Sequence, residues 1–329
     1  MRKQVLKKTI IALLTIYLIV TISFVLIHVM PGDPIIHLVG QEEYYYLLDN
    51  DPETLNQMIQ KYGLDDSMTV QYLKYLKSIV TLDFGISYSN QRPVLENILR
   101  AAKWTVMLSI PTWILSGILG AVLGVLAGWK PGKLFDKIMT PIFLVLNTIP
   151  SNCLCLVMLI FFAYELKWFP INGMVSPGKM GFQRTVSILH HMCLPLIILI
   201  LFRTASNFML MKSAVSQVRK EEYILTATSK GLPQRKVLFR HVMRNALLPY
   251  MTSFCVQMGG LLSGSMIVEV VFGWKGMGML MYNAVQNRDF PTAQFCFLLS
   301  AVCVVVSNLV SDVVNLAVDP RLKEEGQNE

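Results

Sequence analysis

The sequence predicts an all-α polytopic membrane protein with six transmembrane helices. Hydrophobic residues make up 53% of the 329-residue chain and charged residues only 15%, whereas about 25% of a typical soluble domain is charged. Six apolar segments are long enough to cross a bilayer, which takes about 20 residues of helix. Because a span in lipid must pair its own backbone groups, and the short alternating segments of a β-barrel are absent from the sequence, each segment is expected to be helical.

The six predicted spans are spread along the whole chain: Thr9–Met30, Trp104–Trp129, Ile138–Tyr164, Met192–Met211, Leu247–Phe272 and Ala293–Val318. The first span follows basic residues, as the apolar part of a signal peptide does, but it is too long and lacks a small-residue cleavage site. We therefore expect an uncleaved first helix over 1–30, an extracellular segment over 31–103, and a core of five spans over 104–329 with a cytoplasmic loop at 212–246.

The distribution of Lys and Arg predicts the orientation in the membrane. Eight basic residues fall between positions 212 and 244, whereas segment 31–103 has six basic and ten acidic residues. Since basic residues concentrate in cytoplasmic loops, the N- and C-termini are expected in the cytoplasm, with the protein in the plasma membrane. The net charge of +8 then reflects topology and gives little support for nucleic acid binding.

The extracellular segment is expected to pack on the outer ends of the spans, because it is too small for much of a core of its own. It opens with a turn at "PGDPI" and continues with helices in "DPETLNQMIQKYG" and "SMTVQYLKYLKSIVTLDFG". Within the spans, Gly117, Gly120 and Gly124 are expected to permit close helix packing.

Polar residues inside spans cost free energy, so each is a candidate functional residue. We expect these residues to line a translocation path or a subunit interface, or else to hold helices together: Arg203, Glu269, Asn308 and Asp312. Arg203 is the deepest of them. Glu269 and Asp312 lie near the ends of their spans. For these two residues, a role in joining helices is at least as well supported as a place in a translocation path.

No catalytic or metal-binding motif is visible. The chain has no His-Glu-x-x-His or Gly-x-Ser-x-Gly sequence, and its six cysteines lie in or at the ends of apolar spans without zinc-like spacing. "GWKPGKL" at 128–134 resembles a phosphate loop only briefly, because Leu134 stands where Ser or Thr is required. We expect a transport protein that is not an enzyme, with no cofactor or metal, and with ATP hydrolysis, if used, in another subunit.

The polar, basic segment Glu221–Pro249 admits three interpretations: a helix-turn-helix reader of nucleic acid, an amphipathic helix on anionic lipid, or a docking element for a cytoplasmic partner. We expect one helix over Glu221–Ser229, a break at Gly231 and Pro233, and a second helix over Gln234–Ala246 that runs directly into the fifth span. On that second helix, one side is predicted to carry Leu238, Phe239, Val242 and Ala246. The small residues before the break and the rigid connection favour a docking element.

The same segment resembles the coupling loop of bacterial ABC importer permeases, and most closely that of the dipeptide/oligopeptide/nickel family. The resemblance rests on these residues: Tyr223, Thr226, Ala227, Lys230, Gly231, Leu232, Val237, His241, Arg244, Asn245, Ala246, Leu248 and Pro249. "MPGDP", "DFGISYSNQRPV", "VEVVFGWKGMG" and "VDPRLK" are also similar to the first, B-type, permease subunit of that family. One departure is Lys275, where proline is common; it is expected to alter an outer turn.

The resemblance implies the type I ABC importer permease fold and a coupling role for the loop residues, with Ala227 and Gly231 allowing close approach of an ATPase and Lys230 and Arg235 pairing with its acidic groups. It implies a second homologous permease, two cytoplasmic ATPases that bind ATP and Mg²⁺, and an extracellular solute-binding protein. Peptides are the favoured solute, and nickel or a metal–chelator complex is the alternative. A membrane-anchored, nucleic-acid-binding regulator and a passive channel are weaker hypotheses.

Overall fold

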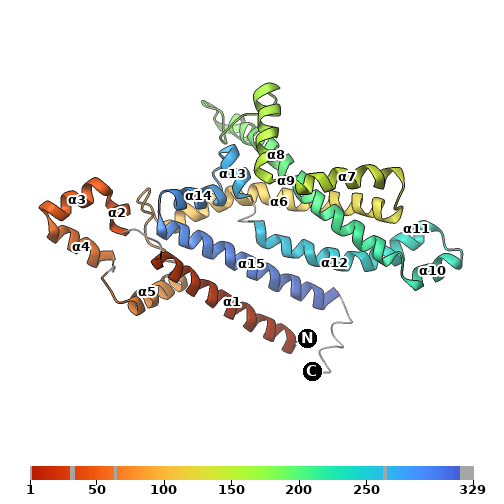
Figure 1. Ribbon diagram of the computed structural model, residues 1–329, viewed down its shortest axis with the longest axis horizontal. Coiled ribbons are helices and arrows are strands. Elements are labelled where there is room, and N and C mark those ends of the chain that lie inside the picture. The colour runs from red at the N-terminus through yellow and green to blue at the C-terminus, as the bar shows by residue number, and fades with distance from the viewer. Residues whose placement is uncertain (1, 30–33, 63–64, 262–264, 319–329) are drawn as a thin grey trace.

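The computed structural model consists of helices joined by turns and loops (Figure 1). It describes residues 2–29, 34–62, 65–261 and 265–318. Within these residues the only β-type pairing is an isolated bridge between Ile86 and Pro93, so the all-α prediction is confirmed. The predicted turn at Pro31-Gly32-Asp33 lies outside the described residues.

Among the described residues, four single helices are long and apolar enough to cross a membrane. They match the first, second, fourth and sixth predicted spans and are α1 (Arg2–Val29), α6 (Val94–Trp129), α9 (Gly181–Val218) and α15 (Phe290–Val318). Helices α6 and α9 begin earlier than predicted. Hydropathy identifies only the part of a helix that crosses the lipid, whereas the helical backbone hydrogen bonds of α6 and α9 extend into the more polar residues that precede that part.

The third predicted span, Ile138–Tyr164, is not one straight helix. It consists of α7 (Leu134–Thr148) and, bent from it by 104°, α8 (Ser151–Met158) with the π-helical η1 (Leu159–Glu165). Pro150 explains the break, because proline has no N–H to donate and disfavours helical geometry in the residue before it. Ile149 accordingly has extended dihedrals, φ −69° and ψ 128°.

The fifth predicted span is likewise a bent pair. Helix α12 (Met243–Val256) continues as η3 (Gln257–Leu261), and α13 (Met266–Phe272) follows at an angle of 47°. Residues 262–264 between them lie outside the described part of the chain. The described residues therefore contain four candidate membrane spans, or six if each bent pair counts as one span.

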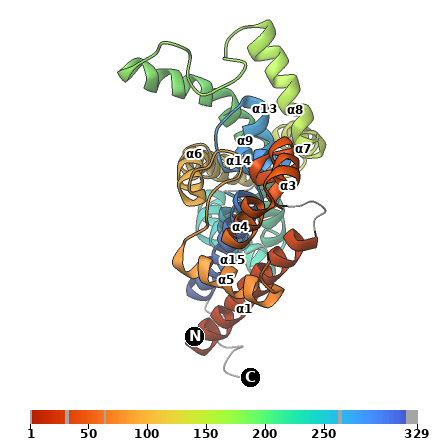
Figure 2. The ribbon, with the colours of Figure 1, turned by 90° about the vertical axis from the view of Figure 1, so that its left-hand side faces the viewer.

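Helices α6 and α9 pack against each other along much of their length and form the centre of the bundle (Figure 1). Glycines permit this approach: a Cβ on Gly120 would lie 2.3 Å from Cβ of Asn207, and one on Gly124 would lie 2.7 Å from Cβ of Met211. The predicted role of these glycines in helix packing is confirmed. Figure 2 shows that α8 and the first turns of α9 project away from the other spans.

The segment before α6 divides into two parts. Helix α5 (Met68–Thr81) packs on one end of the spans, and His28 of α1 contacts Gln71 through a 2.8 Å hydrogen bond. The second part projects beyond the bundle with a small apolar cluster of its own (Figure 1) and comprises α2 (Pro34–Val39), α3 (Gln41–Asn50) and α4 (Pro52–Tyr62).

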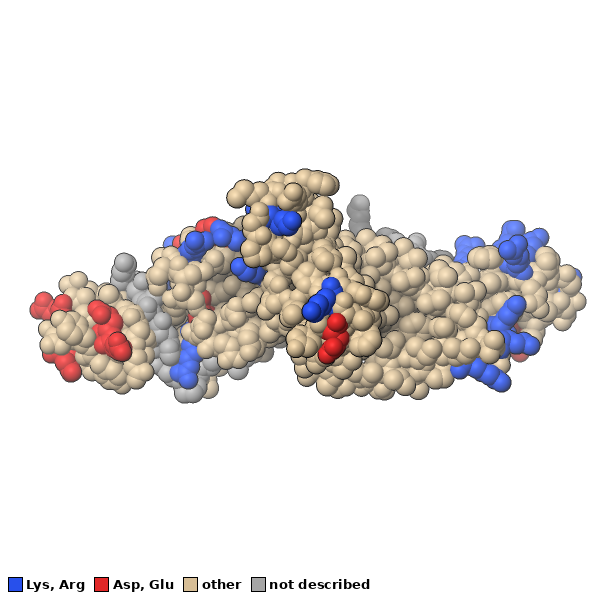
Figure 3. Space-filling model, turned by 90° about the horizontal axis from the view of Figure 1, so that it is seen from above, with Lys and Arg blue, Asp and Glu red and all other residues tan. Residues whose placement is uncertain are grey.

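Opposite charges gather at opposite ends of the long axis. Lys and Arg side chains concentrate at the end that carries α10 (Glu222–Ser229) and α11 (Gln234–Lys236), whereas Asp and Glu predominate over α3 and α4 (Figure 3). The start of α1 and the end of α15 both point toward the basic end (Figure 1).

Candidate functional site

The loop between α9 and α12 has the two-helix form predicted for it. Helix α10 leaves the end of α9, and the chain reverses at Gly231, whose φ of +72° lies in the left-handed region that favours glycine. The Gly231 N–H donates to the Thr228 carbonyl at 3.0 Å, which closes the last turn of α10. From Gln234, helical structure continues through α11, η2 (Val237–Val242) and α12 without interruption.

The inner side of the loop is a small apolar core shared with α6 and α9. Ile224 and Ala227 of α10 pack with Val237 and Val242 of η2 and with Val215 of α9. Ala227 is buried within this chain, so its small side chain permits close packing between the loop's own helices. This packing ties α10 to α9 and to the helical segment that continues into α12.

The prediction that Phe239 shares one side of the second helix with Leu238, Val242 and Ala246 is wrong. Phe239 is 67% exposed, and Val237 takes a buried position with Leu238, Val242 and Ala246. The cause is the π-helical geometry of η2, whose i→i+5 hydrogen bonds turn the residues to a different angular spacing from that of an α-helix.

The outer side of the loop exposes most of the residues predicted to contact a partner: Tyr223, Thr226, Lys230, Gly231 and Arg235. Leu232 is partly buried. Leu225 is 60% exposed, an apolar side chain on the same outer side of the loop. Asn245 Nδ2 donates a 2.6 Å hydrogen bond to the hydroxyl of Tyr223, which fixes α10 to the second helix.

A groove of about 740 Å³ lies between this loop and the turn joining α6 to α7. Its walls combine basic side chains with apolar ones, including Lys130, Lys133, Arg219, Leu225 and Leu232. The turn and the loop thus form one continuous, basic surface at this end of the molecule.

A polar contact that the sequence analysis missed stabilises the same end. Helix α9 continues to Val218, so the predicted loop boundary at 212 lies inside it. Lys212 Nζ lies 2.6 Å from Asp136 Oδ1 of α7 and donates a 2.7 Å hydrogen bond to the Thr140 hydroxyl. The only signs of this contact in the sequence are a carboxylate, Asp136, at the start of one apolar segment and a lysine, Lys212, at the end of another.

Glu269 is fully buried inside this chain. Its Oε1 accepts hydrogen bonds from the hydroxyls of Thr105 (2.7 Å) and Ser265 (2.8 Å). Its Oε2 accepts from the backbone N–H groups of Gly278 (2.8 Å) and Met279 (3.2 Å), in the first turn of α14 (Met277–Gln286). The carboxylate caps α14 and joins it to α6, which favours the role of holding helices together over a place in a translocation path.

The two polar residues of α15 have different surroundings. Asp312 Oδ1 forms an ion pair with Lys8 Nζ of α1 at 2.6 Å, so it too joins helices. Asn308 is exposed on the surface of the single chain.

Arg203 is partly buried near the middle of α9 and lines a cavity of about 430 Å³. The remaining lining is contributed by α8, α9 and α13: Ser151, Leu199, Phe202, Met266, Ile267 and Val268. Sequence reasoning identified the residue but could not place α8 and α13 beside it.

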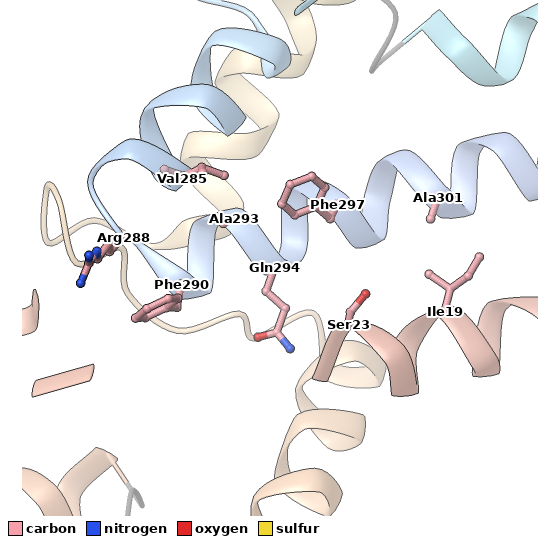
Figure 4. A pocket seen from close by; sticks show the side chains of 10 residues that line it. Ile19, Ser23, Val285, Arg288, Phe290, Ala293, Gln294, Phe297 and Ala301 are labelled. Atoms are coloured by element: carbon pink, nitrogen blue, oxygen red, sulfur yellow. The ribbon is translucent and has the colours of Figure 1, made fainter. Parts of the chain in front are cut away.

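A further cavity, of about 490 Å³, opens between α1 and the α14–α15 region (Figure 4). Ile19 of α1 and Phe297 of α15 give it a mainly apolar surface, with Arg288 as the charged residue in its lining. Such a surface suits acyl chains or apolar side chains better than a polar solute.

Lys275 occupies the turn between α13 and α14. Its backbone N–H donates to Sδ of Met174 at 3.4 Å, a contact that a proline at this position could not make. Its side chain is exposed, so the departure is confined to the surface of this turn. Among the described residues, no group of three or more His, Cys, Asp and Glu side chains is placed to hold a metal ion.

Comparison with known families covers nearly the whole chain. Residues 120–324 match the binding-protein-dependent transport system inner membrane component, and residues 1–109 match the N-terminal part of such membrane components. The chain is 32% identical to the oligopeptide transport system permease protein AppB of Bacillus subtilis, over 98% of this chain and 100% of that protein.

Two other relatives show the same extent of similarity. The di/tripeptide transport system permease protein DppB of Pseudomonas aeruginosa is 30% identical over 94% of this chain and 96% of its own length. The glutathione transport system permease protein GsiC of Escherichia coli is 29% identical over 98% and 99%. Together with the helical, multi-pass architecture, these matches establish the type I importer permease fold and a transport role that is not enzymatic. The chain belongs to the family of binding-protein-dependent transport system inner membrane components, the permease subunits of ABC importers.

Proposed function

We propose that this chain forms half of the translocation path of an ATP-driven importer for peptides. The relatives named above are permeases for di- and tripeptides, oligopeptides and glutathione, which favours peptides over nickel or a metal–chelator complex. The other half of the path comes from a second, homologous permease subunit. An extracellular solute-binding protein delivers the peptide to the outer face.

The proposed coupling role is supported by one observation: the loop is packed on α9 and continues without a break into α12. The outer side of α10 presents Tyr223, Thr226 and Lys230 for docking in a groove of a cytoplasmic ATPase, while its inner side is packed on α9 and on η2. Since η2 continues into α12, closure of two ATPases around ATP and Mg²⁺ would move the attached spans as one body. Lys230 and Arg235, which are both exposed, would pair with acidic groups of the ATPase.

The charge distribution supports an orientation with both termini and the loop in the cytoplasm. The basic end of the molecule carries α10 and α11, and the acidic α3 and α4 lie at the other end (Figure 3). Basic residues near spans are retained on the cytoplasmic side, and their affinity for anionic lipid adds to this preference. No nucleic acid partner is proposed.

The coupling role is tested by comparing Thr226→Trp with Gln217→Trp in the complete importer. Both positions are exposed at the same end of the molecule, Thr226 on α10 and Gln217 on α9. Thr226→Trp should block the close approach of the ATPase, reduce ATPase co-purification and lower peptide uptake at least about tenfold, a loss of about 1.4 kcal/mol. Gln217→Trp should leave both near wild type. Normal coupled uptake by Thr226→Trp would rule the docking role out.

A further inference from the structure

Arg203 lies where a positive charge is costly. Its helix, α9, is one of the four single helices that can cross a membrane, and Arg203 is near the middle of it. Insertion measurements place the cost of an arginine at the centre of a membrane helix at about 2.5–3.5 kcal/mol. Such residues face the protein interior or a water-filled cavity, and they mark pathways for polar solutes.

In the described part of the chain, the surroundings of Arg203 offer space and no carboxylate. The cavity of about 430 Å³ is lined otherwise by apolar side chains and by Ser151. Glu269 follows Val268 in the chain, but its carboxylate is turned away and is fully engaged with Thr105, Ser265 and the start of α14. Among the described residues, Arg203 has no partner for an ion pair or a hydrogen bond.

The N-terminus of α8, which contributes Ser151 to the cavity, adds to the positive electrostatic potential of Arg203. Ser151 is the first residue of α8, and no side chain caps that end of the helix. The N-terminus of a helix carries a partial positive charge and free N–H groups. Transporters built with interrupted helices direct such ends at anionic groups of their substrates near the middle of the bilayer.

We propose that Arg203 binds the C-terminal carboxylate of a peptide as it passes through the translocation path. This inference rests on the proposed function, since it needs the solute to be a peptide. The guanidinium can hold a carboxylate through two parallel hydrogen bonds. Leu199, Phe202 and Ile267 line the cavity beside it with apolar surface for the terminal side chain.

The test uses the complete importer, with its partner subunits, in proteoliposomes that are supplied with the solute-binding protein and one defined library. Half of the library consists of di- and tripeptides with free C-termini, and the other half consists of the same peptides as C-terminal amides. Wild type, Arg203→Met and Arg203→Lys are compared by mass spectrometry of the imported peptides. The ratio of free to amidated peptides is measured within each sample, so it is independent of the amount of active protein.

The proposal expects Arg203→Met to lower uptake of free-carboxylate peptides about tenfold or more, in line with a charge-assisted hydrogen bond, and to change uptake of amides less than about twofold. Arg203→Lys, which keeps the charge, should retain an intermediate ratio. An unchanged ratio in Arg203→Met would overturn the proposal, as would loss of the second permease from the purified complex, which would assign Arg203 to the subunit interface. If wild type imports neither half of the library, the proposed peptide function fails, and the inference fails with it.

Discussion

Thr105 and Glu269 lie 164 positions apart in the chain, and the Thr105 hydroxyl donates a 2.7 Å hydrogen bond to the fully buried carboxylate of Glu269. The same hydroxyl accepts a 2.7 Å hydrogen bond from the backbone N–H of Met277, where α14 begins. Gly278 donates its N–H to the other carboxylate oxygen. Because a carboxylate is favoured at a helix N-terminus, this cluster fixes the start of α14 against α6.

Glu269→Ala should strongly destabilise the protein. The substitution leaves two hydroxyls and two backbone N–H groups without their acceptor, and each buried group left unsatisfied costs about 1–3 kcal/mol. We expect the free energy of unfolding to fall by at least about 3 kcal/mol, measured as a lower thermal unfolding temperature of the purified protein in detergent.

Glu96→Ala is the matched control for this carboxylate. Glu96 pairs with Arg100 at 2.5 Å one helical turn away, but both side chains are more than half exposed. Exposed pairs contribute about 0–1 kcal/mol, so the unfolding temperature should barely change. Equal shifts in the two variants would contradict the capping role of Glu269.

Gly120→Ala should loosen the contact between α6 and α9. A Cβ at this position would lie 2.3 Å from Cβ of Asn207, and the α9 backbone at Phe208 N is only 3.0 Å away. Overpacking of this kind costs about 1–3 kcal/mol. At Gly260, no described atom beyond the neighbouring residues of its own helix lies within 4 Å of an added Cβ, so Gly260→Ala should leave thermal stability unchanged or slightly raised. If the two alanine variants unfold at the same temperature, close packing at Gly120 is not what stabilises the pair.

Local composition was sufficient to predict most of the fold. The lengths of the apolar segments predicted the positions of the spans, and Gly231 with Pro233 predicted the break in the loop. The bend of 104° at Pro150 could not be predicted from proline alone, because Pro195 lies inside α9, which continues as one helix. Whether neighbouring groups satisfy the freed carbonyl depends on packing that the sequence does not display.

The candidate site was less predictable, because its geometry depends on residues far apart in the chain. Sequence reasoning placed Glu269 near the end of a span but could not find its partners on α6 and α14. An α-helical period puts Phe239 on the same side of the helix as Leu238, Val242 and Ala246. The period of η2 is π-helical, so Phe239 turns away from them. The free-energy cost of a charged side chain inside a membrane span points to Arg203 from the sequence alone. The cavity beside it forms only because the bend before α8 brings Ser151 next to α9.

The partly buried pair of Lys212 and Asp136 should show energetic coupling. Lys212→Met alone leaves the Asp136 carboxylate without its cation, which costs about 3–5 kcal/mol at a fully buried site and should cost less here, because both side chains keep some exposure. The double variant Lys212→Met/Asp136→Leu should recover much of that loss, since an apolar pair can replace a buried ion pair. Thermal unfolding of the two single variants and the double variant gives the coupling energy.

The ion pair between Lys8 and Asp312 is the control for this cycle. Its side chains are 36% and 42% exposed, against 21% and 13% for Lys212 and Asp136. Both residues lie near the ends of their spans, where interfacial water screens a pair this exposed, so the coupling energy should stay below about 1 kcal/mol. A larger coupling between Lys8 and Asp312 than between Lys212 and Asp136 would contradict this account.

The orientation of the loop can be tested by cysteine labelling. In a background with the six native cysteines replaced by alanine, Ser229→Cys introduces a thiol at the exposed end of α10, and Tyr45→Cys introduces one on α3 at the opposite end. The positive-inside distribution predicts that a membrane-impermeant maleimide labels position 45 in right-side-out vesicles and labels position 229 only after permeabilisation. The reverse pattern would put the loop outside, where no ATPase driven by cytoplasmic ATP could dock on it.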